Sequence, residues 1–170
     1  MGAMESQTAT EFDQTRSQAP GAARQATKTV VAAALLRRRP GHEVELFIAR
    51  RTSPASVAGM WEFPGGKLEA GETLHQGLHR ELREELGVDV ALYAEVTGQG
   101  SKSYASEAGW WLKETTAMRL FRGEILDGEP FPLQDHDRVD WAPLTPQLLD
   151  YPWIPADRPI VEQLLKDSKS

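Results

Sequence analysis

Three glutamates with the spacing of a metal-binding cluster lie near the middle of the chain. Glu81, Glu84 and Glu85 stand at positions i, i+3 and i+4, which places their side chains on one side of a helix. Like charges at this spacing destabilise a helix, and cations between the carboxylates relieve the repulsion. Hard divalent ions such as Mg²⁺ take oxygen ligands and often bridge carboxylates to substrate phosphates. For three glutamates alone, a solvated acidic face is the simpler interpretation.

The segment that carries these glutamates predicts a short helix with defined ends. Thr73 followed three residues later by Gln76 forms a capping box at the helix start. Gly87 fits the left-handed conformation that ends many helices. Leucines at every fourth position predict the side of the helix that faces a core. They are Leu74, Leu78, Leu82 and Leu86.

A longer pattern surrounds the helix and removes the simpler interpretation. It runs Gly66, five residues, Glu72, seven residues, Arg80-Glu81-Leu82, one residue, Glu84-Glu85, one residue, Gly87-Val88. This matches the complete Nudix box at every fixed position, so the chain resembles the Nudix hydrolases. Those enzymes hydrolyse a nucleoside diphosphate linked to another moiety and use divalent metal held by this helix.

The resemblance implies a fold, a cofactor and a set of site residues. The expected fold is the α/β Nudix fold, an α/β/α sandwich around a mixed β-sheet. The expected cofactor is Mg²⁺, with Mn²⁺ as the alternative. The resemblance implies that Glu81, Glu84 and Glu85 bind metal and act in catalysis, with a backbone carbonyl of Gly66 as a further ligand. Arg80 is expected to orient Glu84 by a salt bridge, and Glu72 to brace the loop.

Length and composition indicate a single domain. The chain has 170 residues, a net charge of −6 and no cysteine, so disulfides and thiolate zinc sites are excluded. The negative charge argues against a nucleic-acid polymer as partner. Because no long apolar run or signal peptide is visible, a cytoplasmic location without membrane contact is expected. Residues 1–26 are expected to be disordered, beginning with a tag remnant at Met1–Met4, and residues 27–170 to form the domain. The protein is expected to be a monomer or a homodimer.

Hydrophobic patterns and turn signals predict the remaining elements. The predicted strands are Val30–Leu36, Val44–Arg51, Trp61–Phe63, Asp89–Thr97, Trp110–Phe121 and Val139–Ala142, with a polar hairpin at Gly98–Gly109. The predicted helices that follow are Thr145–Asp150 and Pro159–Lys166.

Residues 61–67, with the sequence WEFPGGK, resemble the MutT branch of the family. By that resemblance Glu62 and Phe63 are expected to bind substrate. Lys67 is expected to hold a phosphate as a point charge. Arg50 and Arg51 close a strand and point to opposite faces, so at most one of them enters the site, and the resemblance favours Arg51.

Two later positions resemble further parts of MutT-like sites. Asp135 lies six residues before Trp141, where a glutamate in MutT-like proteins completes the metal shell, and Asp137 is nearby. Asp157 ends a segment that resembles the base-reading loop of MutT and of bacterial CTP pyrophosphohydrolases. An ionised Asp157 would only accept hydrogen bonds, which suits cytosine or oxidised guanine. His136 is expected to be an isolated loop histidine.

The expected activity is Mg²⁺-dependent hydrolysis of a nucleoside triphosphate to monophosphate and pyrophosphate. The expected substrates are CTP, dCTP and 5-methyl-dCTP, or 8-oxo-dGTP, in nucleotide-pool sanitation. Glu81 is expected to take a proton from water or to act as a metal ligand. Tyr104 lies sixteen residues past Val88. In some Nudix members a tyrosine at this place marks diadenosine polyphosphate hydrolases, so the resemblance leaves that activity as an alternative. A non-catalytic nucleotide-sensing module is the other alternative, although such relatives often lose the carboxylates that this chain keeps.

Overall fold

The central strand of the fold is β1 (Lys28–Arg37), the long apolar strand expected from the sequence. The computed structural model describes residues 24–132 and 134–170. Within them β1 pairs in parallel with β8 (Thr116–Asp127) and antiparallel with β2 (Glu45–Arg51) and β4 (Gly65–Lys67). The sheet is therefore mixed, as expected.

Shorter strands extend this sheet on both sides. They are β3 (Trp61–Glu62) and β9 (His136–Pro143) beside β2, β5 (Asp89–Glu95) and β7 (Gly109–Trp111) beside β8, and β6 (Tyr104–Ala105) beside β7.

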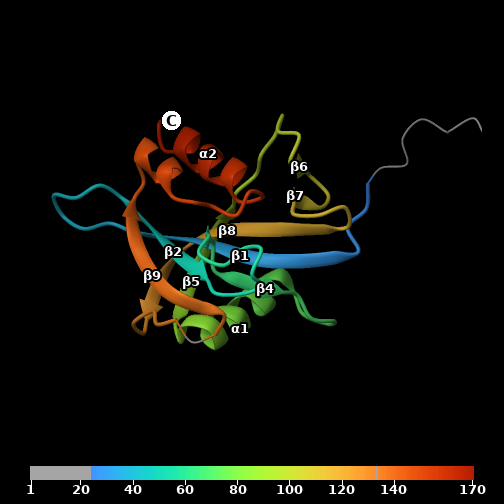
Figure 1. Cartoon of the computed structure of the whole chain (residues 1–170), viewed down its shortest axis with the longest axis horizontal. Coiled ribbons are helices and arrows are strands. Elements are labelled where there is room, and N and C mark those ends of the chain that lie inside the picture. Colours follow the sequence, from blue (N-terminus) through green and yellow to red (C-terminus); the bar gives the residue numbers. More distant parts are fainter. Residues whose placement is uncertain (1–23, 133) are drawn as a thin grey trace, which may run out of the picture.

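One helix covers each face of the sheet. Figure 1 shows α1 (Leu74–Leu86) below the strands and α2 (Arg158–Asp167) above them. The side chains of β1 alternate between these faces, because successive residues of a strand point in opposite directions. Val31 and Leu35 pack in the core that holds the leucines of α1, whereas Ala32 packs in the core that holds Ile160 of α2. The expected α/β/α sandwich is confirmed.

Helix α1 has the ends and the buried side that the sequence predicts. The side chain of Thr73 accepts the Gln76 N–H at 3.1 Å, and the Gln76 side chain accepts the Thr73 N–H at 2.9 Å. Gly87 has a φ of 69° and donates its N–H to the Arg83 carbonyl. Leu74 is partly buried at the first turn. Three leucines are fully buried: Leu78, Leu82 and Leu86.

The prediction of a single strand over Trp110–Phe121 is wrong. The chain reverses at residues 112–115, where the N–H of Leu112 donates to the carbonyl of Thr116 at 2.9 Å. Trp110 consequently pairs with Met118 across a hairpin. The polar run Lys113-Glu114-Thr115 tolerates this exposed turn, and β8 then continues six residues past the predicted end.

Two other predictions needed correction near the C-terminus. Strand β9 begins at His136 rather than Val139, because its first residues pair with the end of β2. The segment Pro146–Asp150 is a 3₁₀ helix, labelled η1.

The start of the described chain lies against the β7–β8 turn. The Arg24 guanidinium lies 3.9 Å from the ring centroid of Trp111, and its Nε donates to the Glu114 carbonyl at 2.7 Å. Most of the predicted disordered segment, and the whole tag remnant, lie outside the described residues. Among the described helices, none has the length and apolar character needed to cross a membrane.

Candidate active site

The loop of β4 lies directly against the acidic side of α1. Pairing of Gly65 and Gly66 with β1 fixes the loop backbone. The Gly65 N–H donates to Glu85 Oε2 at 3.2 Å. A Cβ atom added to Gly66 would overlap the carboxylate of Glu81. The two glycines therefore let the carboxylates of the helix approach the loop backbone, which any larger residue at position 66 would prevent.

Glu85 is a carboxyl group held in an unfavourable electrostatic environment. Burial raises its pKa to about 7, and the neighbouring charges of Glu81 and Glu62 act in the same direction. His136 and the Gly65 N–H oppose this rise in the pKa of Glu85. Burial disfavours a charged carboxylate unless a positive charge compensates it. The site thus has the electrostatic character that favours binding of a cation.

Arg80 links the loop to the helix through several charged partners. Its guanidinium donates to Glu72 Oε1 at 2.5 Å and Glu81 Oε1 at 3.0 Å. It also donates to Glu84 Oε2 at 3.2 Å and to the Lys67 carbonyl at 3.0 Å. These hydrogen bonds raise the pKa of Arg80, with that to Glu72 the largest cause. The expected contact between Arg80 and Glu84 is present, but the shortest contact is with Glu72.

Glu72 completes the connection between Arg80 and the loop. Its Oε2 accepts the Glu69 N–H at 2.9 Å. This hydrogen bond and the stronger one from Arg80 lower the pKa of Glu72. Glu72 therefore contacts the loop and the guanidinium rather than the other carboxylates, which agrees with the bracing role expected for it.

The donors around Gly66 are of the kind that Mg²⁺ takes, namely carboxylate and carbonyl oxygens. In residues 24–132 and 134–170, no three His, Asp or Glu side chains already converge as a ligand cluster. Instead, Arg80 Nη1 contacts both Glu81 and Glu84 and supplies positive charge there. The raised pKa of the half-buried Glu85 and its neighbouring guanidinium indicate that the carboxylates favour a compensating positive charge. The donor set therefore fits a divalent ion.

Asp135 directly precedes β9, beside the end of β2. Its side chain is exposed, and its backbone carbonyl accepts the Thr52 N–H at 2.9 Å. Its part in a metal shell stays a prediction.

A second group of polar side chains joins β2, β3 and β9. Glu62 Oε1 accepts a hydrogen bond from Arg51 Nη1 at 3.1 Å and lies 2.8 Å from His136 Nε2. Arg50 instead forms an exposed pair with Asp137 at 2.8 Å. The two arginines diverge as the strand geometry predicts, and Arg51 is the one that reaches Glu62.

The prediction that His136 is an isolated loop residue is wrong. It belongs to β9, opposite Arg51, and its side chain is 1% exposed. One signal in the sequence could have placed it correctly. His136 lies five residues before Trp141, so the predicted strand could have been extended back to include it.

Asp157 and Phe63 lie on the α2 side of the same region. Phe63 is buried and stacks on Trp153 with 5.5 Å between ring centroids. Its N–H donates to Asp157 Oδ2 at 3.3 Å. Burial raises the pKa of Asp157 to about 8, with Glu62 acting in the same direction. The raised pKa favours the protonated form of Asp157, in contrast to the ionised, purely accepting carboxylate expected from the sequence.

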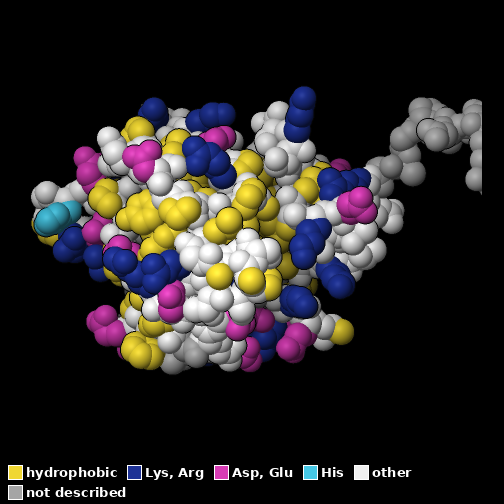
Figure 2. Space-filling view, in the orientation of Figure 1, with side chains coloured by type: hydrophobic (Ala, Val, Ile, Leu, Met, Phe, Trp, Pro, Cys, Tyr) yellow, Lys and Arg dark blue, Asp and Glu magenta, His cyan; other side chains and the backbone are white. Residues whose placement is uncertain are grey.

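The structure thus brings most predicted substrate residues to one region. Glu62 ends β3 and Phe63 follows it directly, so the Arg51 pair and the Asp157 contact come from adjacent residues. Lys67 ends β4 with an exposed side chain. Figure 2 shows several acidic side chains over the lower part of the molecule, where α1 lies.

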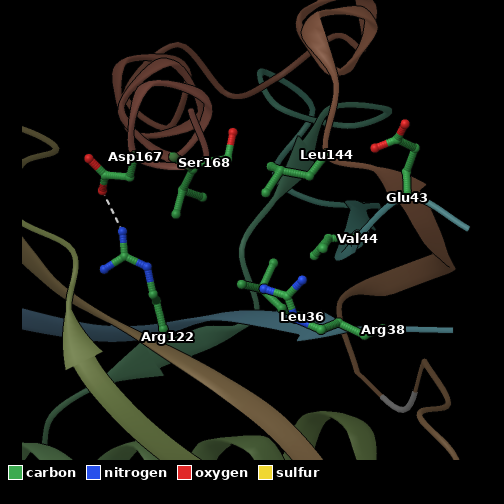
Figure 3. Close-up of a pocket in the computed structure, with 9 residues that line it drawn as sticks. Leu36, Arg38, Glu43, Val44, Arg122, Leu144, Asp167 and Ser168 are labelled. Carbon is green, nitrogen blue, oxygen red and sulfur yellow. Dashed lines mark hydrogen bonds and ion pairs between the residues drawn. The ribbon is translucent and has the colours of Figure 1, made fainter. Parts of the chain in front are cut away.

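A separate hollow of about 460 Å³ lies at the C-terminal end of α2. Figure 3 shows Arg122 directed at Asp167 from the sheet, with Arg38 and Glu43 also at its wall. Its lining contains two arginines and two acids, so it offers little net charge to an anionic nucleotide. None of its lining residues comes from α1 or β4, which places it apart from the candidate active site.

Comparison with known proteins agrees with this geometry. The model of the NUDIX domain matches residues 27–164. The "Putative 8-oxo-dGTP diphosphatase 2" of Mycobacterium tuberculosis is 39% identical over 121 residues, which cover 71% of this chain and 79% of that protein. The "CTP pyrophosphohydrolase" of Escherichia coli is 32% identical over 123 residues, covering 71% and 82%. The solution structure of the E. coli ORF135 protein has a TM-score of 0.62 at 29% identity, covering 84% of this chain and 91% of that one.

The family match spans most of the chain, and both curated relatives exceed 30% identity over more than two thirds of their length. The expectations of a Nudix fold and of a hydrolase are confirmed. The chain belongs to the Nudix family of hydrolases.

Proposed function

We propose that this protein is a divalent-metal-dependent nucleoside triphosphate pyrophosphohydrolase, which converts a triphosphate to a monophosphate and pyrophosphate. The observation that carries the proposal is the contact between the β4 loop and the acidic side of α1. Gly65 donates to the half-buried Glu85, and Gly66 leaves space for the Glu81 carboxylate. Carboxylates that need a cation, next to an accessible loop backbone, suit metal-assisted hydrolysis of a phosphoanhydride.

In this proposal the chain's own side chains hold and orient the reacting groups. Glu81, Glu84 and Glu85 would hold Mg²⁺ or Mn²⁺, and Asp135 and the Gly66 carbonyl are the proposed additional ligands. When bound, the ion neutralises phosphate charge and lowers the pKa of the attacking water.

The proton from that water passes to Glu81, or to another carboxylate if Glu81 serves only as a ligand. Attack at the β phosphorus breaks its bond to the bridging oxygen of the α phosphate. The monophosphate leaves with that oxygen. Arg80 keeps Glu81 and Glu84 in place through its contacts of 3.0 and 3.2 Å.

The proposed substrates are cytosine nucleotides, namely CTP, dCTP and 5-methyl-dCTP, and the oxidised guanine nucleotide 8-oxo-dGTP. The names of the two relatives support both classes. A protonated Asp157 donates one hydrogen bond and accepts another. Cytosine offers an acceptor at N3 beside its N4 amino group, and 8-oxoguanine offers O6 beside its N–H donors. Arg51, Glu62, Phe63 and Lys67 complete the proposed substrate contacts.

One panel of nucleotides tests the proposal. The values of kcat/KM are measured with Mg²⁺ for CTP, dCTP, 5-methyl-dCTP, 8-oxo-dGTP, the four ordinary dNTPs and diadenosine polyphosphates. The proposal predicts that a cytosine nucleotide or 8-oxo-dGTP has the highest value. A higher value for a diadenosine polyphosphate would favour the alternative raised by Tyr104. Binding without hydrolysis of any member would favour a nucleotide-sensing module. A role in nucleotide-pool sanitation and a cytoplasmic location stay predictions.

A further inference from the structure

His136 lies under the substrate side of the site and has no assigned role. Its side chain is 1% exposed, and its Nε2 atom lies 2.8 Å from Glu62 Oε1. A carboxylate only accepts hydrogen bonds, so the imidazole donates through its Nε2–H. The same Glu62 oxygen also accepts from Arg51 Nη1 at 3.1 Å. One carboxylate oxygen is therefore held by two donors from two different strands.

The second ring nitrogen of His136 shows that this arrangement has an energetic cost. Within the described chain, Nδ1 of His136 is the one buried side-chain polar atom without a hydrogen-bond partner from the protein. A buried polar atom without a partner is unfavourable. An apolar residue of similar size would fill the space without that cost. The histidine is thus better explained by its hydrogen bond to Glu62 than by a contribution to the stability of the fold.

Strand pairing explains why this position can control Glu62. His136 stands opposite Arg51 where β9 pairs with β2, and the register shifts between Arg50 and Arg51. Glu62 stands opposite Ala49 where β3 pairs with β2. The imidazole therefore reaches Glu62 across the end of β2, from a residue 74 positions away in sequence. The irregular register directs the two donors, Arg51 and His136, to the same carboxylate.

Glu62 in turn lies on the substrate side of the site. It immediately precedes Phe63, whose N–H donates to the buried Asp157. A change in the position of Glu62 would alter this part of the site. It would also release the Arg51 guanidinium from the carboxylate.

We propose that His136 is a positioning residue that fixes Glu62, and through it Arg51, in the orientation that binds the nucleotide. The proposal rests on the proposed function in that Glu62 and Arg51 contact substrate. Loss of the Nε2–H donor leaves the carboxylates of α1 in place, since those are held by Arg80 and Gly65. The effect therefore falls on KM rather than on kcat.

The test uses three single variants of the full chain. His136→Leu removes the donor and keeps bulk, whereas His136→Gln keeps an N–H donor at a similar distance from the backbone. His42→Leu is the matched control, because it makes the same change at an exposed loop histidine. With the best nucleotide and saturating Mg²⁺, His136→Leu should raise KM by about 10- to 100-fold, the range for a hydrogen bond to a charged group. Its kcat should change less than about threefold, His136→Gln should recover most of the loss, and His42→Leu should match wild type.

A double variant separates positioning from general support of the fold. In a Glu62→Gln background, His136→Leu should raise KM by a much smaller factor than in wild type, because coupled residues are not additive. The same factor in both backgrounds would overturn the proposal. The proposal would also be overturned if His136→Leu lowered kcat in proportion to the folded fraction and left KM unchanged. If His136→Leu does not fold, His136→Asn replaces it in both backgrounds, because its shorter side chain keeps its N–H donor out of reach of Glu62, and the same criterion decides.

Failure of the proposed function would give a different result. If wild type hydrolyses no nucleotide, binding of CMP and 8-oxo-dGMP is measured by tryptophan fluorescence for the same variants. Weaker binding by His136→Leu, recovered by His136→Gln, would support the inference even though the proposed activity had failed. Equal binding by all variants, or no binding by wild type, would overturn it.

Discussion

The carboxylate of Glu81 occupies the space that a side chain on Gly66 would need. This relationship couples the loop to the acidic side of α1. In Gly66→Ala, the new methyl group must displace Glu81 or move β4 away from β1. We expect kcat to fall at least tenfold, because a small displacement of a catalytic group is costly. Steady-state kinetics with saturating Mg²⁺ measures this.

Gly41→Ala is the control for that substitution. Gly41 has a φ of 75° and open space around its Cα, so alanine there strains an exposed turn by about 1 kcal/mol. Stability should fall while kcat stays unchanged. Full activity of Gly66→Ala would show that the position of Glu81 against the loop does not matter for catalysis.

Packing and chemistry on α1 can be separated by two substitutions one turn apart. Leu78 is fully buried, so Leu78→Ala should lower the free energy of unfolding by about 2–5 kcal/mol. Glu81→Gln should instead lower kcat with little change in Tm. Denaturant unfolding and kinetics on both variants measure the two effects. An unchanged stability of Leu78→Ala would contradict the placement of the leucines in the core.

The stability of the metal-free protein should depend on pH in an unusual direction. The pKa of Glu85 is raised to about 7 and that of Asp157 to about 8. A carboxyl whose pKa rises on folding binds its proton more tightly in the folded state. The free energy of unfolding should therefore rise as pH falls through 8 and 7 toward the ordinary value of about 4. For Glu85 alone the gain is at most about 3 kcal/mol.

Urea unfolding in EDTA between pH 9 and pH 5.5 measures this dependence. Glu85→Gln should make the profile flatter and should be more stable than wild type at the alkaline end. Added Mg²⁺ should also flatten the wild-type profile, because it compensates the charge that burial disfavours. A wild-type stability that falls steadily from pH 8 to pH 6 would contradict the burial of these carboxyls.

The local features of the site could be predicted from sequence, and the long-range ones could not. The ends and buried side of α1 follow from residues within one helix, so Thr73, Gly87 and the leucines were enough. The contact of His136 with Glu62 depends on how β9 and β3 both pair with β2. No pattern near either residue contains that information. For the same reason the burial of Asp157, which raises its pKa, could not be predicted, because it depends on the packing of Phe63 after β3 against the start of α2.

The proton on Asp157 gives a prediction about nucleotide binding. With a pKa of about 8, Asp157 donates a hydrogen bond at pH 7 and becomes a pure acceptor above pH 8. The KM for the best nucleotide should rise by about tenfold between pH 7 and pH 9, the effect of one base contact. Asparagine keeps a donor and an acceptor at every pH, so Asp157→Asn should show a much smaller rise. Parallel profiles for the two proteins would show that Asp157 does not contact the base.

The most direct test of the central claim is the identity of the products and their dependence on the α1 carboxylates. Wild type is incubated with CTP or 8-oxo-dGTP and Mg²⁺, and the products are separated by ion-exchange chromatography. The account predicts equal amounts of monophosphate and pyrophosphate, no turnover in EDTA, and a rate lower by orders of magnitude in Glu84→Gln and Glu85→Gln, both still folded. Release of diphosphate and orthophosphate, or near-normal turnover by either glutamine variant at saturating Mg²⁺, would contradict it.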